Sequence, residues 1–374
     1  MALRFSWGIV MIKRVLIYDP VPCNDGSKTV MKTIVAELPS SLDVWVISND
    51  EESWCNSNVH FVKLFSPHFL LNKTSGILYF IKHFIYLFSL ISNMMKLKRF
   101  RKIIGFSGPC ADFSLYLLSE LVHIEIIQLI QYDNNNSRIT DFGLKRASQV
   151  FYLPSTYHSM LPILKSQNND NDMANNNPMP LVNDFNGPIS KRQKSNNQIG
   201  FLWAASLLSW KRVEYFINAL ARQNNTYENT DKYFANLCYI EPQSDDYLNI
   251  DTLDKFYNNL LYSKAKKIND IRANSSIFTS TSKDEAFGLS ILESMAAGLA
   301  IVIPADSAYW DQHLTDGYDC VKYTQNDMES LSQALTRLVN EPTLLLKISQ
   351  QAKLSAQQYC NLHCYSQILK CIPN

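Results

Sequence analysis

The sequence predicts an α/β protein made of two Rossmann-like domains, each with a parallel β-sheet covered by helices. Its 374 residues exceed the usual size of one domain. Short, continuously apolar runs alternate with helical segments in both halves, which is typical of parallel strands buried on both faces. Between the halves, the asparagine-rich tract 166–198 lacks a long apolar run and predicts a loop and an interdomain linker.

The composition indicates a globular protein with a large core. Hydrophobic residues make up 46% of the chain and aromatic residues 12%, which excludes the fibrous and disordered classes. The 35 Lys and Arg residues nearly balance the 34 Asp and Glu residues, so the net charge is +1. This balance gives no electrostatic basis for binding nucleic acid, and we expect no nucleic-acid partner.

The first half begins with a β-branched and aromatic run, Val15–Tyr18, followed by a loop that contains Pro, Asn and Gly. This pattern predicts a strand, then a loop, then a helix over residues 27–38. Further strands are expected over residues 44–48, 60–65, 102–106, 124–130 and 149–153. Residues 1–10 precede a second methionine and are interpreted as an upstream extension. No small-residue cleavage site follows them, so we expect no signal peptide.

Residues 77–102 join an apolar segment to a basic end. The uncharged part, 84–95, is twelve residues long, whereas a spanning helix needs roughly 20, so we expect no membrane crossing. Five basic residues follow within seven positions, namely Lys96, Lys98, Arg99, Arg101 and Lys102. Such a helix suits docking on an anionic membrane surface. A buried helix with a solvated basic C-terminus fits the pattern equally well, because these charges also complement the helix dipole.

Two short patterns have the form of metal sites. Cys360, His363 and Cys364 lie close together, but the segment also fits an ordinary helix with buried thiols. Asp170–Asp172 has the Asp-x-Asp form of a metal and nucleotide-sugar site, although an Asn-rich tract produces such a match by chance. The eight cysteines include no Cys-x-x-Cys pair, as in a reducing cytosol. We therefore expect a cytoplasmic protein without a bound metal or cofactor.

The second half repeats the alternation of strands and helices. Strands are expected over residues 199–207, 235–242, 275–282 and 300–304, helices over 213–222 and 253–266, and a helical tail from about Asn326.

The loop and helix after the strand at 275–282 carry the strongest functional signal. In DEAFGLSILESMAAG, residues 284–298, Glu285 and Glu293 stand eight positions apart. The loop is expected at the carboxyl edge of a parallel sheet, where open α/β sheets bind ligands. Gly288 permits close approach of the backbone, and the N–H groups of Ser290 and Ile291 at the helix start form a seat for a phosphate.

Two interpretations of Glu293 remain open. Ser290-x-x-Glu293 has the form of a capping box, with Gly298 as the C-terminal stop of the helix. Alternatively, Glu293 lies in the first turn and faces a ligand at the helix N-terminus. Glu285 has no capping role, and a loop glutamate beside a phosphate seat must serve an uncharged part of the ligand.

The segment DEAFGLSILESMAAGLAIVIP resembles the E-x7-E signature of retaining glycosyltransferases of family four, which have the GT-B fold with two parallel sheets facing a central cleft. The resemblance implies that Glu285 contacts the donor sugar and that Glu293 binds the nucleotide ribose. It also implies that the loop amides hold the diphosphate, in the segment formed by Phe287, Gly288, Leu289, Ser290 and Ile291.

Two further regions resemble the same family. IGFLWAASLLSWKRVEYFINAL is similar to its first C-domain strand, loop and helix, and Lys211 takes the place of the lysine that neutralises the leaving diphosphate. Ser206 stands where the family has an arginine, and the neighbouring Arg212 is a candidate substitute. RVLIYDPVPCNDGSK and IIQLIQYDNN are similar to the segments beside the cleft in the N-domain, where Gly26 represents a glycine loop and Gln131 replaces a histidine.

The resemblance also implies a domain division. It places an acceptor-side domain in residues 1–182, a linker in 183–198, a nucleotide-sugar donor domain in 199–355, and a C-terminal helix in 356–374 that returns toward the first domain.

The implied activity is metal-independent transfer of a sugar, with retention, from a nucleotide diphosphate sugar to a saccharide or lipid-linked saccharide, in surface polysaccharide or glycolipid biosynthesis. A lipid-linked acceptor would account for residues 77–102 and for a peripheral location on the inner face of the membrane. Two alternatives remain: a non-catalytic nucleotide-sugar-binding partner of another transferase, and a sugar-nucleotide epimerase of the same fold.

Overall fold

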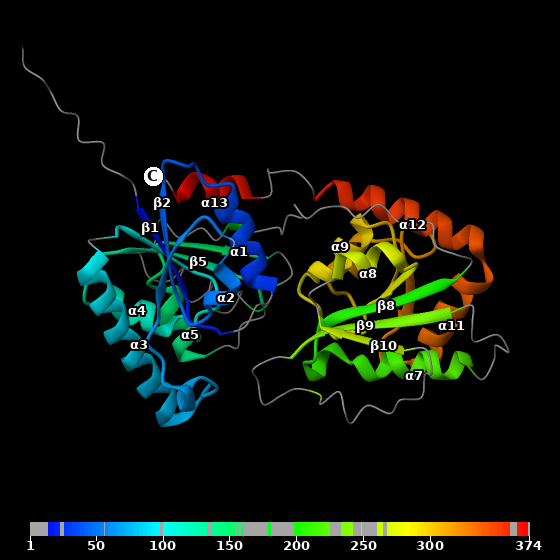
Figure 1. Ribbon diagram of the computed structural model, residues 1–374, viewed down its shortest axis with the longest axis horizontal. Coiled ribbons are helices and arrows are strands. Elements are labelled where there is room, and N and C mark those ends of the chain that lie inside the picture. Colours follow the sequence, from blue (N-terminus) through cyan, green and yellow to red (C-terminus); the bar gives the residue numbers. More distant parts are fainter. Residues whose placement is uncertain are drawn as a thin grey trace, which may run out of the picture. The chain divides into compact units, whose positions relative to one another are not determined.

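Two α/β units make up the chain (Figure 1). Unit 1 comprises Met1–Tyr152, Ser159–Leu181 and Tyr365–Asn374, and unit 2 comprises Leu153–His158 and Val182–Cys364. The structure is a computed structural model, and it describes residues 14–22, 26–55, 57–97, 100–132, 137–153, 156, 159, 179–180, 198–224, 233–241, 248, 260–264, 268–359 and 365–372.

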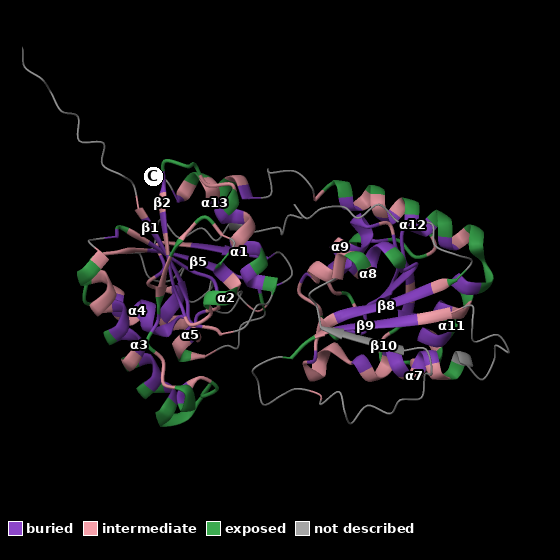
Figure 2. Cartoon of the chain, in the orientation of Figure 1, coloured by how far each residue is buried: buried purple, intermediate pink, exposed green. Residues whose placement is uncertain are grey.

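Unit 1 is built on a seven-stranded parallel sheet of order β3-β2-β1-β4-β5-β6-β7. Its strands are β1 (Arg14–Asp19), β2 (Asp43–Ser48), β3 (His60–Lys63), β4 (Lys102–Gly105), β5 (Glu125–Ile130), β6 (Gln149–Tyr152) and β7 (Met179–Pro180). Its helices are α1 (Gly26–Ala36), α2 (Glu51–Trp54), η1 (His68–Leu70), α3 (Gly76–Leu97), α4 (Phe113–Ser119), α5 (Arg138–Leu144) and α13 (Ser366–Cys371). The central strands are buried (purple in Figure 2), as expected for a parallel sheet covered on both faces.

A buried ammonium group fixes the start of α1 over the sheet. Lys28 is 1% exposed, and its Nζ lies 3.1 Å from Asp19 and 2.7 Å from Asp50. Lys28 also donates a hydrogen bond to the carbonyl of Val21, at 2.7 Å. Because each charge has an opposite charge in contact, the ends of β1 and β2 and the start of α1 hold together without an unpaired buried ion.

Unit 2 contains a six-stranded parallel sheet of order β10-β9-β8-β11-β12-β13. Its strands are β8 (Ile199–Ser206), β9 (Tyr233–Ile240), β10 (Leu260–Lys264), β11 (Ile277–Thr279), β12 (Ala300–Ala305) and β13 (Val321–Thr324). Its helices are η3 (Ser209–Lys211), α7 (Val213–Asn224), α8 (Ile268–Asn274), α9 (Leu289–Ala296), α10 (Tyr309–His313), α11 (Met328–Asn340) and α12 (Pro342–Gln357). Two parallel-sheet α/β units are therefore present, as the sequence predicts.

Three strands differ from the expectation. The helix predicted over 253–266 is wrong in its described part, because 260–264 form β10, paired with β9. A run as short as Leu-Leu-Tyr has no periodicity that distinguishes a strand from a helix. The predicted loop 166–198 contains the two-residue strand β7, paired with β6. Finally, β13 precedes the predicted helical tail and was not expected.

Helix α3 is longer than the uncharged segment that the sequence analysis singled out. It runs for 22 residues, and by length and composition alone it is the one helix among the described residues that could cross a membrane. Its inner face carries Tyr86, Leu87 and Leu90, which belong to the core of unit 1. The helix therefore packs against protein along one side.

A buried carboxyl group lies where β4 and β5 end. Asp112 is 0% exposed, and its Oδ2 accepts hydrogen bonds from the backbone N–H of Ser107 (3.1 Å) and from Gln128 Nε2 (2.9 Å). Burial raises the pKa of Asp112 to about 8, and these two hydrogen bonds oppose the rise. The carboxyl group is therefore protonated in the folded protein at neutral pH.

Replacing Asp112 with Asn should remove a pH dependence of stability. Because the folded pKa of Asp112 lies above its unfolded value, its contribution is present below about pH 4 and is lost as the pH rises toward 8. Between pH 5 and pH 7 the free energy of unfolding of the wild type should fall relative to that of D112N. The expected slope is about 1 kcal/mol per pH unit. Denaturant titrations across this range measure the difference, and parallel pH profiles would contradict the assignment.

Candidate functional site

Four loops of unit 2 leave the same edge of its sheet. They follow β8, β11, β12 and β13, which are parallel, so the loops gather at the carboxyl edge. Each loop contains one non-glycine residue in the left-handed region, namely Arg212 (φ 52°), Asp284 (φ 52°), Ser307 (φ 61°) and Asn326 (φ 67°). These four are all such residues in the described part of the chain. Strained backbone of this kind concentrates at functional sites, which makes this edge the candidate site.

Lys211 and Glu285 meet at this edge. Lys211 ends η3, in the loop after β8, whereas Glu285 lies in the loop after β11. Their side chains form an ion pair and are 13% and 15% exposed, so each keeps a small exposed part. The ammonium of Lys211 also lies 3.9 Å from the ring centroid of Trp210. The structure thus brings together the two residues in which the sequence analysis placed catalysis.

A buried hydroxyl group holds the two loops against each other. Thr281, 2% exposed, accepts a hydrogen bond from Trp203 Nε1 on β8 (2.9 Å) and donates one to the carbonyl of Lys211 (2.7 Å). The backbone N–H of Lys283 donates to the carbonyl of Trp210, at 2.9 Å. The backbone positions of Lys211 and of the loop that carries Glu285 are therefore coupled.

The N-terminus of α9 begins beside this pair. Gly288 is its N-cap, with φ 75° and no side-chain capping bond. The N–H groups of Leu289 and Ser290 have no hydrogen-bond partner among the described residues, whereas that of Ile291 donates to the carbonyl of Gly288 at 2.9 Å. The open N–H groups that the sequence predicts at Ser290 and Ile291 are therefore those of Leu289 and Ser290, because α9 begins at Leu289.

Glu293 pairs with a side chain of another helix, whereas the capping-box interpretation gives it a backbone N–H group at the helix start. The capping-box interpretation is wrong: α9 begins at Leu289, which leaves Glu293 beyond the first turn. Its carboxylate pairs with the guanidinium of Arg272 on α8, whose side chain is 5% exposed. Burial raises the pKa of Glu293, and the charge of Arg272 opposes the rise. The carboxylate is 20% exposed, so the pair is mostly enclosed by protein.

The side chains of Phe287 and Ile291, which were predicted to bind the donor, are buried in the protein core, and that of Arg212 contacts a different loop. Phe287 is 2% exposed and packs against Tyr309 and Trp310, and Ile291 is 3% exposed, so both can offer a ligand only their backbones. Ser206 ends β8, half-buried. The guanidinium of Arg212 donates to Asn326 Oδ1 in the loop after β13, rather than extending to Glu285.

The two residues predicted for the N-domain lie in unit 1. Gly26 is the first residue of α1. Gln131 follows β5 directly and is 5% exposed, and its Nε2 has no hydrogen-bond partner in the part of the chain that the structure describes.

The predicted metal-like patterns lie outside the described residues. This applies to Asp170–Asp172 and to Cys360, His363 and Cys364. Within the described ranges, no group of three or more His, Cys, Asp or Glu side chains is placed to hold a metal ion.

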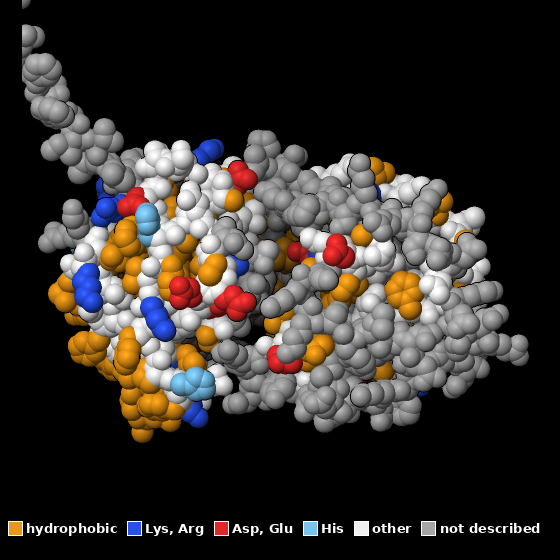
Figure 3. Space-filling model, in the orientation of Figure 1, with side chains coloured by type: hydrophobic (Ala, Val, Ile, Leu, Met, Phe, Trp, Pro, Cys, Tyr) orange, Lys and Arg blue, Asp and Glu red, His pale blue; other side chains and the backbone are white. Residues whose placement is uncertain are grey.

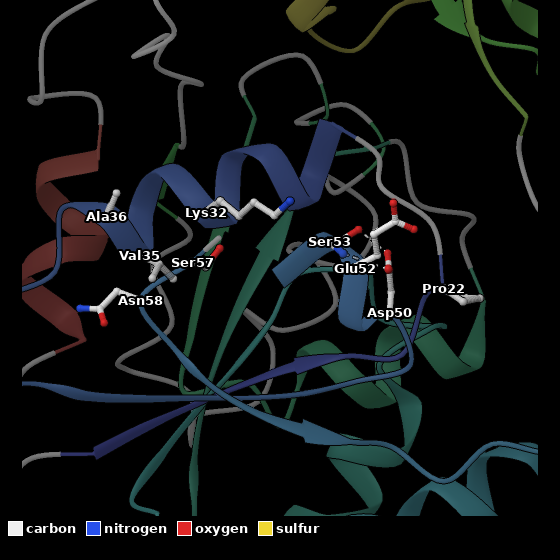
Figure 4. Close-up of a pocket in the computed structure, with 9 residues that line it drawn as sticks. All are labelled: Pro22, Lys32, Val35, Ala36, Asp50, Glu52, Ser53, Ser57 and Asn58. Atoms are coloured by element: carbon white, nitrogen blue, oxygen red, sulfur yellow. Dashed lines mark hydrogen bonds between the residues drawn. The ribbon is translucent and has the colours of Figure 1, made fainter. Parts of the chain in front are cut away.

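A separate cavity of about 830 Å³ lies in unit 1, beside α1 and α2 (Figure 4). It is lined by Pro22, Lys32, Val35, Ala36, Asp50, Glu52, Ser53, Ser57 and Asn58. The carboxylate of Asp50 is already bound by Lys28 and Ser53. None of the predicted site residues lines this cavity.

The comparisons agree with this architecture. Residues 188–355 match the family described as "Glycosyl transferases group 1". No curated protein matches the sequence. Among solved structures, Alr3699/HepE from Anabaena in complex with UDP and glucose is 14% identical with a TM-score of 0.73, covering 96% of this chain and 98% of that one.

Two further structures are similar over the same share of the chain. A glycosyltransferase from Rickettsia africae is 15% identical (TM-score 0.68; 96% of this chain and 98% of that one). Sucrose-phosphate synthase from Thermosynechococcus elongatus is 13% identical (TM-score 0.70; 96% and 97%). These likenesses show the GT-B fold, as predicted.

Replacing Gly288 with Ala should disturb the loop that carries Glu285. A Cβ at this position would lie 2.9 Å from Glu285 Cγ and 3.0 Å from Ile291 Cδ1. Gly317 is a matched control, because it also has a positive φ, 69°, but no atom lies within 4 Å of its Cβ position. G317A should lower the free energy of unfolding by about 1 kcal/mol from backbone strain alone. G288A should lower it more, and equal effects in denaturant titrations would exclude steric contact with Glu285.

Replacing Arg272 with Met should leave Glu293 as an unpaired, mostly buried carboxylate. Breaking such a pair from one side costs about 3–5 kcal/mol of folding free energy. The exposed pair between Arg222 and Glu329 is the control, and R222M should cost less than about 1 kcal/mol. A cost of R272M no larger than that of R222M would mean that Glu293 gains its stabilisation elsewhere.

Proposed function

We propose that the protein is a retaining glycosyltransferase that moves a sugar from a nucleotide diphosphate sugar to a saccharide or lipid-linked saccharide acceptor. The observation that carries this proposal is the meeting of Lys211 and Glu285 beside the open N-terminus of α9. An ammonium group and two unpaired N–H groups provide positive charge for a diphosphate, and the carboxylate accepts hydrogen bonds from sugar hydroxyls.

The ion pair separates when the donor binds. Lys211 exchanges the carboxylate of Glu285 for a phosphate oxygen of the donor, which frees Glu285 to hold the hydroxyls of the sugar. During transfer, the bond from the anomeric carbon to the diphosphate breaks and the leaving oxygen gains negative charge. Lys211 and the amides of Leu289 and Ser290 stabilise that charge. The acceptor oxygen attacks the same face of the sugar, and its proton passes to the departing phosphate.

The spacing between Glu285 and Glu293 supports retention, since it resembles the signature of retaining enzymes. Lys211 and the helix N-terminus can supply the positive charge that a metal ion supplies to a diphosphate in other enzymes, so we propose that catalysis needs no metal. The ribose role of Glu293 must be compatible with its pairing to Arg272. The remaining exposed part of the carboxylate is the part available to a ribose hydroxyl.

One observation favours a second candidate, a nucleotide-sugar-binding partner without activity. Ser206 carries no charge and Arg212 is bound to Asn326, so Lys211 is left as the one basic side chain placed beside Glu285 among the described residues. Leaving-group stabilisation would then be weaker than with two cations.

Substitution of Lys211 or Glu285 should reduce turnover while the fold persists. Purified protein is screened with a panel of nucleotide sugars that begins with UDP-glucose, together with saccharide and lipid-linked acceptors. Loss of the group that stabilises the leaving diphosphate, in K211M, should lower kcat by about a hundredfold to a thousandfold. E285Q should also lower kcat, because a neutral amide holds sugar hydroxyls less strongly. Lys283, exposed on the same loop, is the control, and K283M should retain activity.

Product analysis distinguishes the candidates. A transferase releases nucleotide diphosphate at an appreciable rate only when an acceptor is present, and the new glycosidic bond keeps the anomeric configuration of the donor. An inactive partner binds the donor without turnover, and an epimerase changes the sugar without an acceptor. Undiminished turnover of E285Q would contradict the role of Glu285, and inhibition by a chelator would contradict metal independence.

A further inference from the structure

Helix α3 exposes an apolar stripe to solvent, whereas Lys82, His83 and Ser89 are buried on its inner face beside core residues. From Ile77 to Ile91, each exposed position is apolar, namely Ile77, Leu78, Phe80, Ile81, Phe84 and Phe88. Ile77, Ile81, Phe84 and Phe88 follow the helical spacing of a single stripe, which Met95 extends. A surface helix of a soluble protein normally has the opposite arrangement.

Two polar side chains of α3, Lys82 and His83, are buried in unit 1 and each makes a hydrogen bond there. Lys82 is 9% exposed and donates to the carbonyl of Lys73. His83 is 1% exposed and accepts a hydrogen bond from the backbone N–H of Ser114 at 3.3 Å. Burial lowers the pKa of His83 to about 3, so its ring is neutral. These contacts hold the helix in the orientation that exposes its apolar stripe.

The segment before α3 enlarges the apolar surface. Phe65 is 67% exposed and Phe69 is 68% exposed. The backbone N–H of Phe65 donates to Ser89 Oγ on α3, at 3.0 Å, which attaches this segment to the helix. Figure 3 shows hydrophobic side chains gathered over this part of unit 1, with Lys and His side chains beside them. We call the exposed stripe of α3, together with Phe65 and Phe69, the apolar face.

The segment that contains the apolar face is basic. Residues 53–111 contain eight Lys and Arg residues and no Asp or Glu, although the whole chain is almost neutral. Among them, Lys63 and Lys96 are exposed and form no ion pair with a described residue. Both line a shallow hollow of about 470 Å³ whose other walls include Phe65 and Phe88. An ammonium group next to aromatic rings suits a phosphate headgroup above acyl chains.

We propose that the apolar face docks unit 1 on an anionic lipid bilayer. The stripe of α3 lies in the plane of the membrane at the boundary between headgroups and acyl chains, and Lys63 and Lys96 contact lipid phosphates. The helix does not span the bilayer, because Tyr86 and Leu90 on its inner face are part of the protein core. A purely apolar partner surface would leave this basic region without counter-charge. The proposal concerns unit 1 and does not depend on the proposed reaction in unit 2.

Sedimentation with lipid vesicles tests the proposal on the full-length protein. We compare vesicles of phosphatidylcholine alone with vesicles that contain phosphatidylglycerol, at low and moderate salt. The double variant F84S/F88S removes two rings from the stripe and should reduce binding to anionic vesicles at least tenfold. L346S/L354S is the matched control, because these unit 2 leucines are each 53% exposed, as is Phe84. This control should bind like the wild type.

The basic residues are tested separately. Loss of one lysine from a lipid-binding surface weakens binding roughly fivefold. K63E/K96E should weaken binding by more than this factor for each lysine, because each substitution also reverses the charge. The four positions substituted in F84S/F88S and K63E/K96E are all exposed, so the melting temperatures of both variants should equal that of the wild type.

Three outcomes would overturn the proposal. They are absence of binding to anionic vesicles, equal binding to phosphatidylcholine, and unchanged binding by F84S/F88S. Concentration-dependent self-association that F84S/F88S abolishes, without any lipid binding, would assign the apolar face to a protein interface instead.

Discussion

The candidate site depends on one hydrogen-bonded hydroxyl group. Thr281 joins Trp203 in β8 to the backbone of Lys211, although Thr281 itself lies in the loop after β11. A hydrogen bond contributes about 1 kcal/mol net to stability, but an unsatisfied buried indole N–H costs about 1–3 kcal/mol. Removing the hydroxyl group of Thr281 alone would therefore cost more than the net value of its hydrogen bond to Trp203. This connection fixes the spacing between the loops, which in turn sets whether Lys211 can reach Glu285.

The parts of the site that the sequence predicts are those set by local spacing. Gly288, Glu285 and the following helix belong to one short segment, and a strand before it places that segment at the carboxyl edge. The partner of Glu293 was not predictable, because Arg272 lies on α8 and only the sheet order brings α8 next to α9. The capping box failed because the N-cap is the left-handed Gly288, two residues before Ser290, and the helix begins at Leu289.

The orientation of α3 illustrates a second limit of sequence reasoning. Apolar residues occur all around this helix, so periodicity does not show which side faces inward. The choice is made by a few polar groups with specific partners: His83 accepts from Ser114, and Lys82 donates to Lys73. A buried polar group without a partner costs free energy, so these hydrogen bonds favour the orientation in which Lys82 and His83 face the protein.

The two ion pairs flanking α9 have different physical characters. In the pair between Arg272 and Glu293, the cation is 5% exposed, and removal of either charge would leave the other one in a poorly solvated position. Lys211 and Glu285 belong to loops at the sheet edge, and their side chains are 13% and 15% exposed. A site built in this way is electrically balanced when it is empty. Under the proposed function, a diphosphate that binds to Lys211 displaces the carboxylate of Glu285, so binding of the diphosphate and placement of the sugar form a single coupled step.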